Sequence, residues 1–240
     1  MQIISIINQK GGVGKTTTVI NLAAGLSKKG KKILVIDLDP QGNATTGLGL
    51  SNVQNSDDTI YGVLNGTKAI NEVIKKTDFE NLDIITSNVD LSGLEVETAA
   101  DSKRAFLLKD QLMAYLNDSR SNYDYIFIDC PPSLSLLTVM ALVASFSLIV
   151  PLQTEFFALE GLTQLMKTIE RIKANLNKEL KIRGILLTMY DKRNKLSSQV
   201  EKEARDYFES QVYDTVIPRN VRLSEAPSHG VPVLIYDRNC

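Results

Sequence analysis

The chain has 240 residues, of which 43% are hydrophobic and 23% are charged, and its formal net charge is −1. This composition is typical of a soluble globular protein with one sizeable core, and no repeat or low-complexity tract interrupts it. Because the overall charge is weak, any binding of nucleic acid must come from a local basic patch. The two cysteines, Cys130 and Cys240, form no disulfide framework, which fits a reducing cytoplasm.

The N-terminal segment predicts a strand, a helix and a second strand. Residues 2–7 are a β-branched run, as in a strand that is buried on both faces. A glycine-rich turn follows, and Thr16–Lys28 has the apolar spacing of a helix, which Gly30 ends. Lys32–Asp37 is a second apolar strand, so the unit is expected to be a right-handed parallel crossover.

The same alternation continues along the chain. The apolar run Leu134–Val150 ends at Pro151 and predicts a buried helix followed by a strand, not a membrane span. Further strands are expected at Leu82–Thr86, Tyr125–Asp129, Ser147–Val150, Ile182–Thr188 and Val212–Ile217, and helices at Phe156–Ile172 and Leu196–Phe208. The predicted fold is therefore α/β, a doubly wound, mostly parallel sheet flanked by helices, with ligands at the carboxyl ends of the strands.

A phosphate-binding loop lies between the first strand and the first helix. Three glycines allow the backbone to curl so that its N–H groups can face phosphate oxygens at the helix N-terminus. Lys15 is expected to face the β- and γ-phosphates, and the Thr16 hydroxyl to bind magnesium. The predicted ATP-binding residues of the loop are Lys10, Gly11, Gly12, Val13, Gly14, Lys15, Thr16 and Thr17. A glycine-rich turn that binds nothing is the alternative.

The loop departs from the common pattern, because Gln9 replaces the usual first glycine and Lys10 is added. In this it resembles the deviant Walker A class. That resemblance implies that Lys10 reaches across a dimer to the partner's nucleotide and adds positive charge in the transition state. The alternative is a solvated loop lysine.

Acidic residues follow two of the predicted strands. Asp37 and Asp39 come after the second strand, and Asp129 ends the apolar strand Tyr125–Asp129 in a Walker B pattern. The resemblance implies that Asp39 positions the attacking water, that Asp37 lies near the magnesium shell, and that Asp129 holds magnesium through water. Capping of the following loop is the alternative for Asp37 and Asp39. The single histidine, His229, excludes a histidine-based metal cluster.

Beyond the loop, the chain resembles the ParA/Soj chromosome- and plasmid-partitioning ATPases over residues 1–237. The matching motifs are Asn8–Thr17, Asp37–Thr45, Asp129–Ser133, Gln153–Gly161 and Val216–Gly230. The last two motifs are more specific than any phosphate loop. This resemblance implies a slow ATPase that uses ATP and Mg²⁺, with Lys10, Lys15 and Asp39 as catalytic residues.

The resemblance also implies partners. The ATP-bound homodimer would bind DNA without sequence preference through Arg193 and Arg222, and a ParB-like centromere-binding protein would stimulate hydrolysis. Basic residues at positions 178, 181, 183, 192 and 195 support such a patch, although a solvated basic surface is the alternative. Pro218 and Asn220 are the expected adenine contacts, with an ordinary proline turn as the alternative.

We expect a single ATPase domain over residues 1–240, cytoplasmic and nucleoid-associated, without membrane binding. It would lack the N-terminal helix-turn-helix region of longer plasmid relatives and their final C-terminal helix. The main alternative is a MinD-like division-site regulator, which requires a lysine-rich amphipathic tail that is not seen here. A dethiobiotin-synthetase-like ligase and a nitrogenase-type iron protein rank lower, the latter because Cys240 is a poor cluster ligand.

Overall fold

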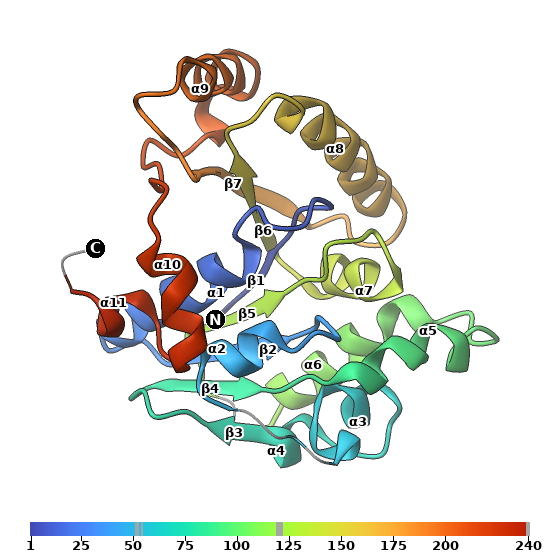
Figure 1. Ribbon diagram of the computed structural model, residues 1–240. Helices are drawn as coiled ribbons and strands as arrows, with labels where there is room; N and C mark the ends of the chain where they lie inside the picture. The colour runs from blue at the N-terminus through green and yellow to red at the C-terminus, as the bar shows by residue number, and fades with distance from the viewer. Residues whose placement is uncertain (51–52, 54, 119–121, 239–240) are drawn as a thin grey trace.

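The computed structural model describes residues 1–50, 53, 55–118 and 122–238, so Cys240 lies outside the described residues. One seven-stranded sheet organises the chain, in the order β3-β4-β2-β5-β1-β6-β7 (Figure 1). All neighbouring strands are parallel except the edge pair β3 and β4. The strands are β1 Gln2–Ile6, β2 Ile33–Asp37, β3 Ile74–Lys76, β4 Leu82–Ile85, β5 Tyr125–Asp129, β6 Ser147–Gln153 and β7 Lys181–Thr188.

Helices cover both faces of the sheet. Val19, Ile20 and Ala23 of α1 pack on one face against β1, β2 and β4. On the other face, α6 and α7 pack on β2 and β5, and α8 and α9 continue the layer over β6 and β7. The helices are α1 Lys15–Ser27, α2 Asn43–Gly47, α3 Ile60–Leu64, α4 Ile70–Val73, α5 Leu94–Glu97, α6 Leu107–Leu116, α7 Leu136–Ala144, α8 Ala158–Asn175, α9 Lys195–Phe208, α10 Arg222–Glu225 and α11 Val233–Tyr236.

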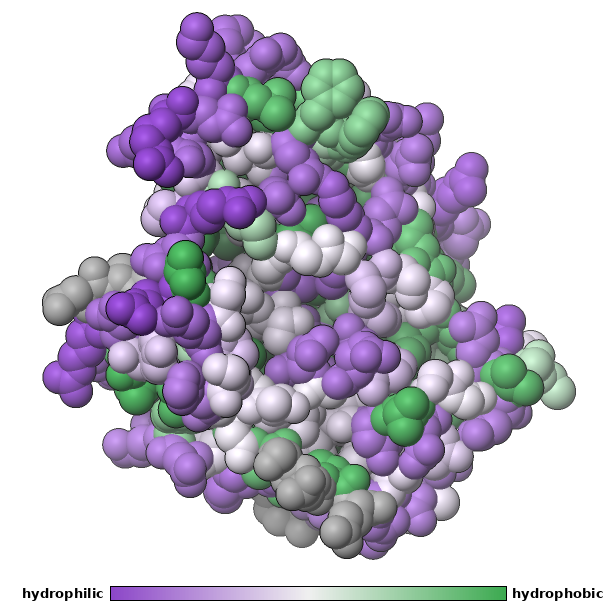
Figure 2. Space-filling model, viewed as in Figure 1, coloured by the Kyte–Doolittle hydropathy of each residue, from purple (hydrophilic) through white to green (hydrophobic). Residues whose placement is uncertain are grey.

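This arrangement confirms the predicted doubly wound α/β fold. The apolar run after residue 134 forms α7 and β6 as expected. No helix among the described residues is long and apolar enough to cross a membrane. On the face shown in Figure 2, apolar residues form small separate patches within a largely hydrophilic surface.

At the sheet edges, one expected strand is absent and one strand occurs that was not expected. Val212–Ile217 is not a strand, because its only bridge to β7 is an isolated one at Ile185–Val212, and the second bridge, Tyr190–Pro218, lies beyond both segments. Its Tyr213 ring packs over Gly184, where an added Cβ would lie only 2.4 Å from the ring, and Pro218 has no N–H to donate. The short antiparallel strand β3 was not expected at all.

The buried C-terminal end of α7 is capped from another element. The Asn177 side-chain amide, which is 8% exposed, donates to the carbonyls of Leu142, Val143 and Ser145 at 2.9, 3.2 and 2.8 Å. A helix leaves its last carbonyls without intrahelical partners. Asn177 therefore satisfies groups that no water reaches easily.

Candidate functional site

The phosphate loop lies on the central part of the sheet, because β1 pairs with β5 on one side and β6 on the other. Asn8 donates to the carbonyl of Pro151 at 2.7 Å, and the Thr188 hydroxyl donates to that of Val13 at 2.9 Å. Gly12 and Gly14 adopt φ of 75° and 91°, a left-handed conformation that glycine adopts at no steric cost. The loop is thus held in place by hydrogen bonds to two neighbouring strands, β6 and β7.

Lys15 begins α1 and turns its side chain back over the loop. Its ammonium donates to the carbonyl of Lys10 at 3.0 Å, and the residue is 7% exposed. Burial lowers the pKa of Lys15, while the nearby charges of Asp129 and Asp39 act in the opposite direction. A cation held in this position suits a ligand that carries negative charge.

Three buried aspartates lie at neighbouring strand ends. Asp37 and Asp129 are partners in the β2–β5 register, and Asp39 follows β2 by two residues. Asp37 accepts hydrogen bonds from the amide and hydroxyl of Thr45, at 2.8 and 2.7 Å, and from the amide of Asp39 at 3.2 Å. Burial raises the pKa of Asp37 to about 6, although these hydrogen bonds lower it.

Asp129 differs from Asp37 in its partners. It is fully buried, and neither of its oxygens accepts a hydrogen bond of ordinary geometry from the described part of the chain. Burial and the charge of Asp37 raise its pKa well above the usual range, whereas the nearby Thr16 hydroxyl and Lys15 lower it. Such a carboxylate has unused acceptor capacity that faces the start of α1.

The donor set fits magnesium. The described residues contain no group of three or more histidine, cysteine or acidic side chains that could hold a metal by themselves. Magnesium prefers oxygen ligands and is usually bound by one or two protein groups together with phosphates and water. Thr16 and Asp129 are suited to that role, with Asp37 behind them, bound by Thr45.

An open cavity of about 540 Å³ lies over the loop. Seven of the predicted site residues line it, Gly11, Gly12, Gly14, Lys15, Thr16, Thr17 and Asp39, together with Ile20, Asn43, Thr46, Pro132, Met189, Ser224, Pro227 and Ser228. Pro218 and Asn220 are not among the lining residues. Pro218 instead bridges to Tyr190, and the Asn220 side chain accepts from the amide of Arg222 at 2.9 Å.

Sequence reasoning did not select the far wall of this cavity. That wall comes from Met189, directly after β7, and from the segment that includes Ser224, Pro227 and Ser228. Met189 has a φ of 50°, which is uncommon outside glycine. The only signal in the sequence was the Val216–Gly230 motif, within which the last three residues lie.

Lys10 lies at the rim of the loop. Its side chain is 49% exposed and forms an ion pair with Glu155, which precedes α8. Gln9 donates to the carbonyl of Gly161 at 2.7 Å, so two loop residues contact the β6–α8 region.

The two predicted DNA-contacting arginines lie outside the cavity lining. Arg193 forms a two-point contact with Asp191, at 3.0 and 2.9 Å, and its side chain is 91% exposed. Arg222 donates to Glu225 at 2.7 Å and lies 3.5 Å from Asp237. Both guanidinium groups thus face carboxylates of their own chain.

A phosphate-binding loop on a doubly wound sheet, with acidic residues at the adjacent strand ends, defines a P-loop nucleotide-binding protein. A family model described as an AAA domain matches residues 1–182. The chain is 53% identical to the chromosome partitioning protein ParA of Caulobacter vibrioides, covering all of this chain and 89% of that one. It is 51% identical to the sporulation initiation inhibitor protein Soj of Bacillus subtilis, covering 98% and 91%.

Among solved structures, cobyrinic acid a,c-diamide synthase of Mycobacterium smegmatis, with bound ATP analog and magnesium, has a TM-score of 0.84 and 35% identity. The similarity covers 95% of this chain and 92% of that one. The present chain belongs to the ParA/Soj family of chromosome-partitioning ATPases.

Proposed function

We propose that this protein is an ATP-dependent switch for DNA segregation, which binds DNA as an ATP-bound dimer and is reset by hydrolysis. The observation that carries the proposal is the high identity to a chromosome partitioning protein over the whole chain, well beyond the phosphate loop. The phosphate loop alone supports only nucleotide binding. The second-half similarity supports a role in partitioning a chromosome or a plasmid.

ATP would bind over the loop, with its phosphates against the backbone N–H groups and Lys15. Magnesium, when bound by Thr16 and by Asp129 through water, neutralises phosphate charge. Asp39 lines the cavity and accepts from the amide of Gln41 at 3.0 Å, which leaves its other oxygen to orient a water molecule. Asp37 would stabilise the magnesium shell from behind.

Lys10 would join two ATP-bound protomers. Its side chain is half exposed and its partner is a single rim carboxylate, so it can leave Glu155 at modest cost and reach a second copy's nucleotide. Closure of the dimer would double the DNA-binding surface, so nucleotide state would control avidity. A ParB-like protein would then stimulate hydrolysis and release the DNA.

Arg193 and Arg222 would bind phosphates of the DNA backbone. Both are exposed, and each would exchange a carboxylate of its own chain for a phosphate oxygen. Such contacts carry no sequence information, which suits a cytoplasmic, nucleoid-associated protein that moves over any DNA. We place all of these functions in one domain spanning residues 1–240.

The decisive experiment measures binding to a random-sequence duplex with ATP, ADP or no nucleotide, across a salt series. We expect binding only with ATP, with an affinity that falls steeply as salt rises. The double variant Arg193→Ala/Arg222→Ala should lose binding, whereas Arg171→Ala, an exposed arginine on α8, should retain it. Binding that ignores nucleotide, or survives the double substitution, would refute the proposal. Flotation with anionic vesicles and ATP would detect the MinD-like alternative.

A further inference from the structure

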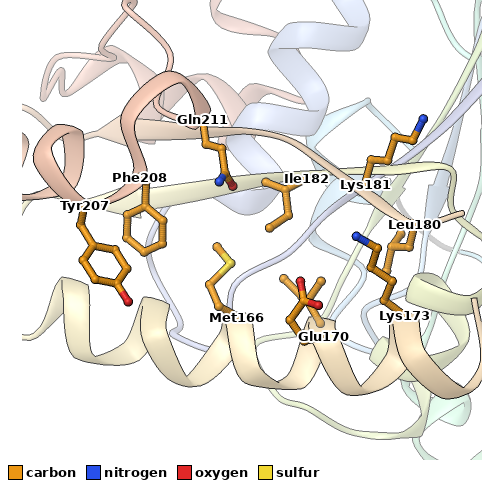
Figure 3. A pocket seen from close by; sticks show the side chains of 10 residues that line it. Met166, Glu170, Lys173, Leu180, Lys181, Ile182, Tyr207, Phe208 and Gln211 are labelled. Carbon is orange, nitrogen blue, oxygen red and sulfur yellow. The ribbon is translucent and has the colours of Figure 1, made fainter. Parts of the chain in front are cut away.

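A second cavity, of about 510 Å³, lies away from the phosphate loop. It is a groove between α8, the end of α9 and the start of β7 (Figure 3). Its apolar lining consists of Met166, Ile169, Leu180, Ile182 and Phe208. The apolar lining of a groove this size can accommodate one or two large side chains of a ligand.

The two ends of the groove differ in chemistry. Lys173 of α8 and Lys181 of β7 lie at one end, and Tyr207 and Phe208 lie at the other (Figure 3). The Tyr207 ring is 72% exposed and packs edge to face on Phe208, with ring centroids 4.7 Å apart. Neither lysine forms an ion pair with any described residue. One end therefore offers aromatic surface, and the other offers two lysines beside the single carboxylate of Glu170, an excess of one positive charge.

Next to the groove, the start of β7 has no second strand neighbour among the described residues up to Gly184, which is buried beneath the Tyr213 ring. β7 is the last strand of the sheet, and the segment after α9 bonds to it only from Ile185 onward, with Tyr213 donating to the Ile185 carbonyl at 3.0 Å. Within the described residues, Lys181–Gly184 therefore have a strand neighbour only on the β6 side. An extended segment could lie along this edge.

We propose that the groove docks an extended segment of a partner protein that carries an aromatic side chain near an acidic one. The aromatic side chain enters the apolar part beside Met166 and Phe208, where the flexible thioether adapts to its shape. The acidic side chain pairs with Lys173 and Lys181. Charge complementarity selects this occupant over a basic segment.

Duplex DNA fits the groove less well than a peptide does. The floor is apolar, and Glu170 leaves the lining with an excess of only one positive charge, which suits a single carboxylate better than a row of phosphates. The groove also lies at the N-terminal end of β7, whereas Arg193 follows its C-terminal end at Thr188, and an eight-residue strand spans roughly 25 Å. The groove is therefore distant from Arg193, and Lys181, which the sequence groups with the basic residues near Arg193, lies at the opposite end of β7.

Selection from a random phage-displayed peptide library tests this proposal on the full-length protein. Peptides are eluted, sequenced and measured by fluorescence anisotropy. We expect enriched peptides to contain Phe, Tyr or Trp within a few residues of Asp or Glu. Lys173→Glu/Lys181→Glu should weaken these peptides roughly tenfold. The matched control, Lys178→Glu, alters an exposed lysine outside the lining and should change affinity less than twofold.

A second selection makes the charge argument sharper. Panning against Lys173→Glu/Lys181→Glu should enrich Lys and Arg in place of Asp and Glu, while the aromatic residue is retained. The proposal would be overturned if both selections enriched the same residue types. It would also be overturned if the selected peptides bound the double variant and Met166→Arg as tightly as they bind the wild type. A loss of DNA affinity or of self-association in the double variant would overturn it as well, since either would assign the groove to another occupant.

Discussion

The contacts of Asn177 allow us to predict how much stability the protein loses when this side chain is removed. Asn177→Ala removes the amide that caps the buried end of α7 and leaves carbonyls without partners. An amide has two hydrogens, so the three contacts amount to about two hydrogen bonds. Each buried carbonyl left unpaired costs about 1–3 kcal/mol, so the loss of two hydrogen bonds should lower the free energy of unfolding by about 2–6 kcal/mol.

The chain provides a matched control two residues earlier. Asn175 donates to the carbonyl of Arg171 at 2.8 Å at the exposed end of α8. Asn175→Ala should change stability by no more than about 0.5 kcal/mol, because water can replace its single bond. Asn177→Asp, which keeps the shape but turns acceptors toward the carbonyls, should destabilise more than Asn177→Ala.

Urea unfolding followed by circular dichroism measures all three variants under identical conditions. The reasoning fails if Asn177→Ala and Asn175→Ala unfold at the same urea concentration, or if Asn177→Asp is as stable as the wild-type protein.

Three further predictions concern the nucleotide site and the DNA-binding surface. Asp37→Asn should remove a pH dependence: because the folded pKa is about 6 against about 3.8 unfolded, wild-type stability falls as pH rises between these values. We would measure the free energy of unfolding of both proteins in urea, in EDTA without nucleotide. The value for the variant minus that for the wild type should increase by about 2 kcal/mol between about pH 4.5 and about pH 7.5. A difference that does not change with pH would contradict this prediction. Asp39→Ala should abolish phosphate release yet retain ATP-dependent dimers in size exclusion, and monomers would argue against its role with water. Asp191→Asn should free Arg193 and tighten DNA binding roughly two- to fivefold in mobility-shift assays, unlike Asp206→Asn, which frees only Lys202.

Local patterns in the sequence predicted most of the fold and the centre of the site. The β-branched runs predicted β1, β2 and β5 because strands buried on both faces need continuous apolar residues. The loop glycines predicted a tightly curled loop before α1, and strand ends predicted where Asp37 and Asp129 meet. Each of these inferences needed only residues that are close together in the chain.

Features that depend on distant packing were not predictable in the same way. Ser228 reaches the cavity because the 3-10 helix Ala226–His229, which follows α10, packs on α2, far away in sequence, and no local pattern encodes that contact. β3 has three residues and no fully buried side chain, so its alternation is too short to recognise. Val212–Ile217 had the composition of a strand, but it forms only one isolated bridge to β7, at Val212.

Because Gln9 and Lys10 contact the region at the start of α8, a fluorescent residue placed there would report on the loop. The chain contains no tryptophan. Phe156 and Phe157 lie beside Glu155, are 74% and 66% exposed, and pack edge to face with centroids 5.0 Å apart. An indole introduced by Phe157→Trp would be the single tryptophan emitter in the protein. Its fluorescence would follow rearrangements of the loop in real time, with no dye on the nucleotide.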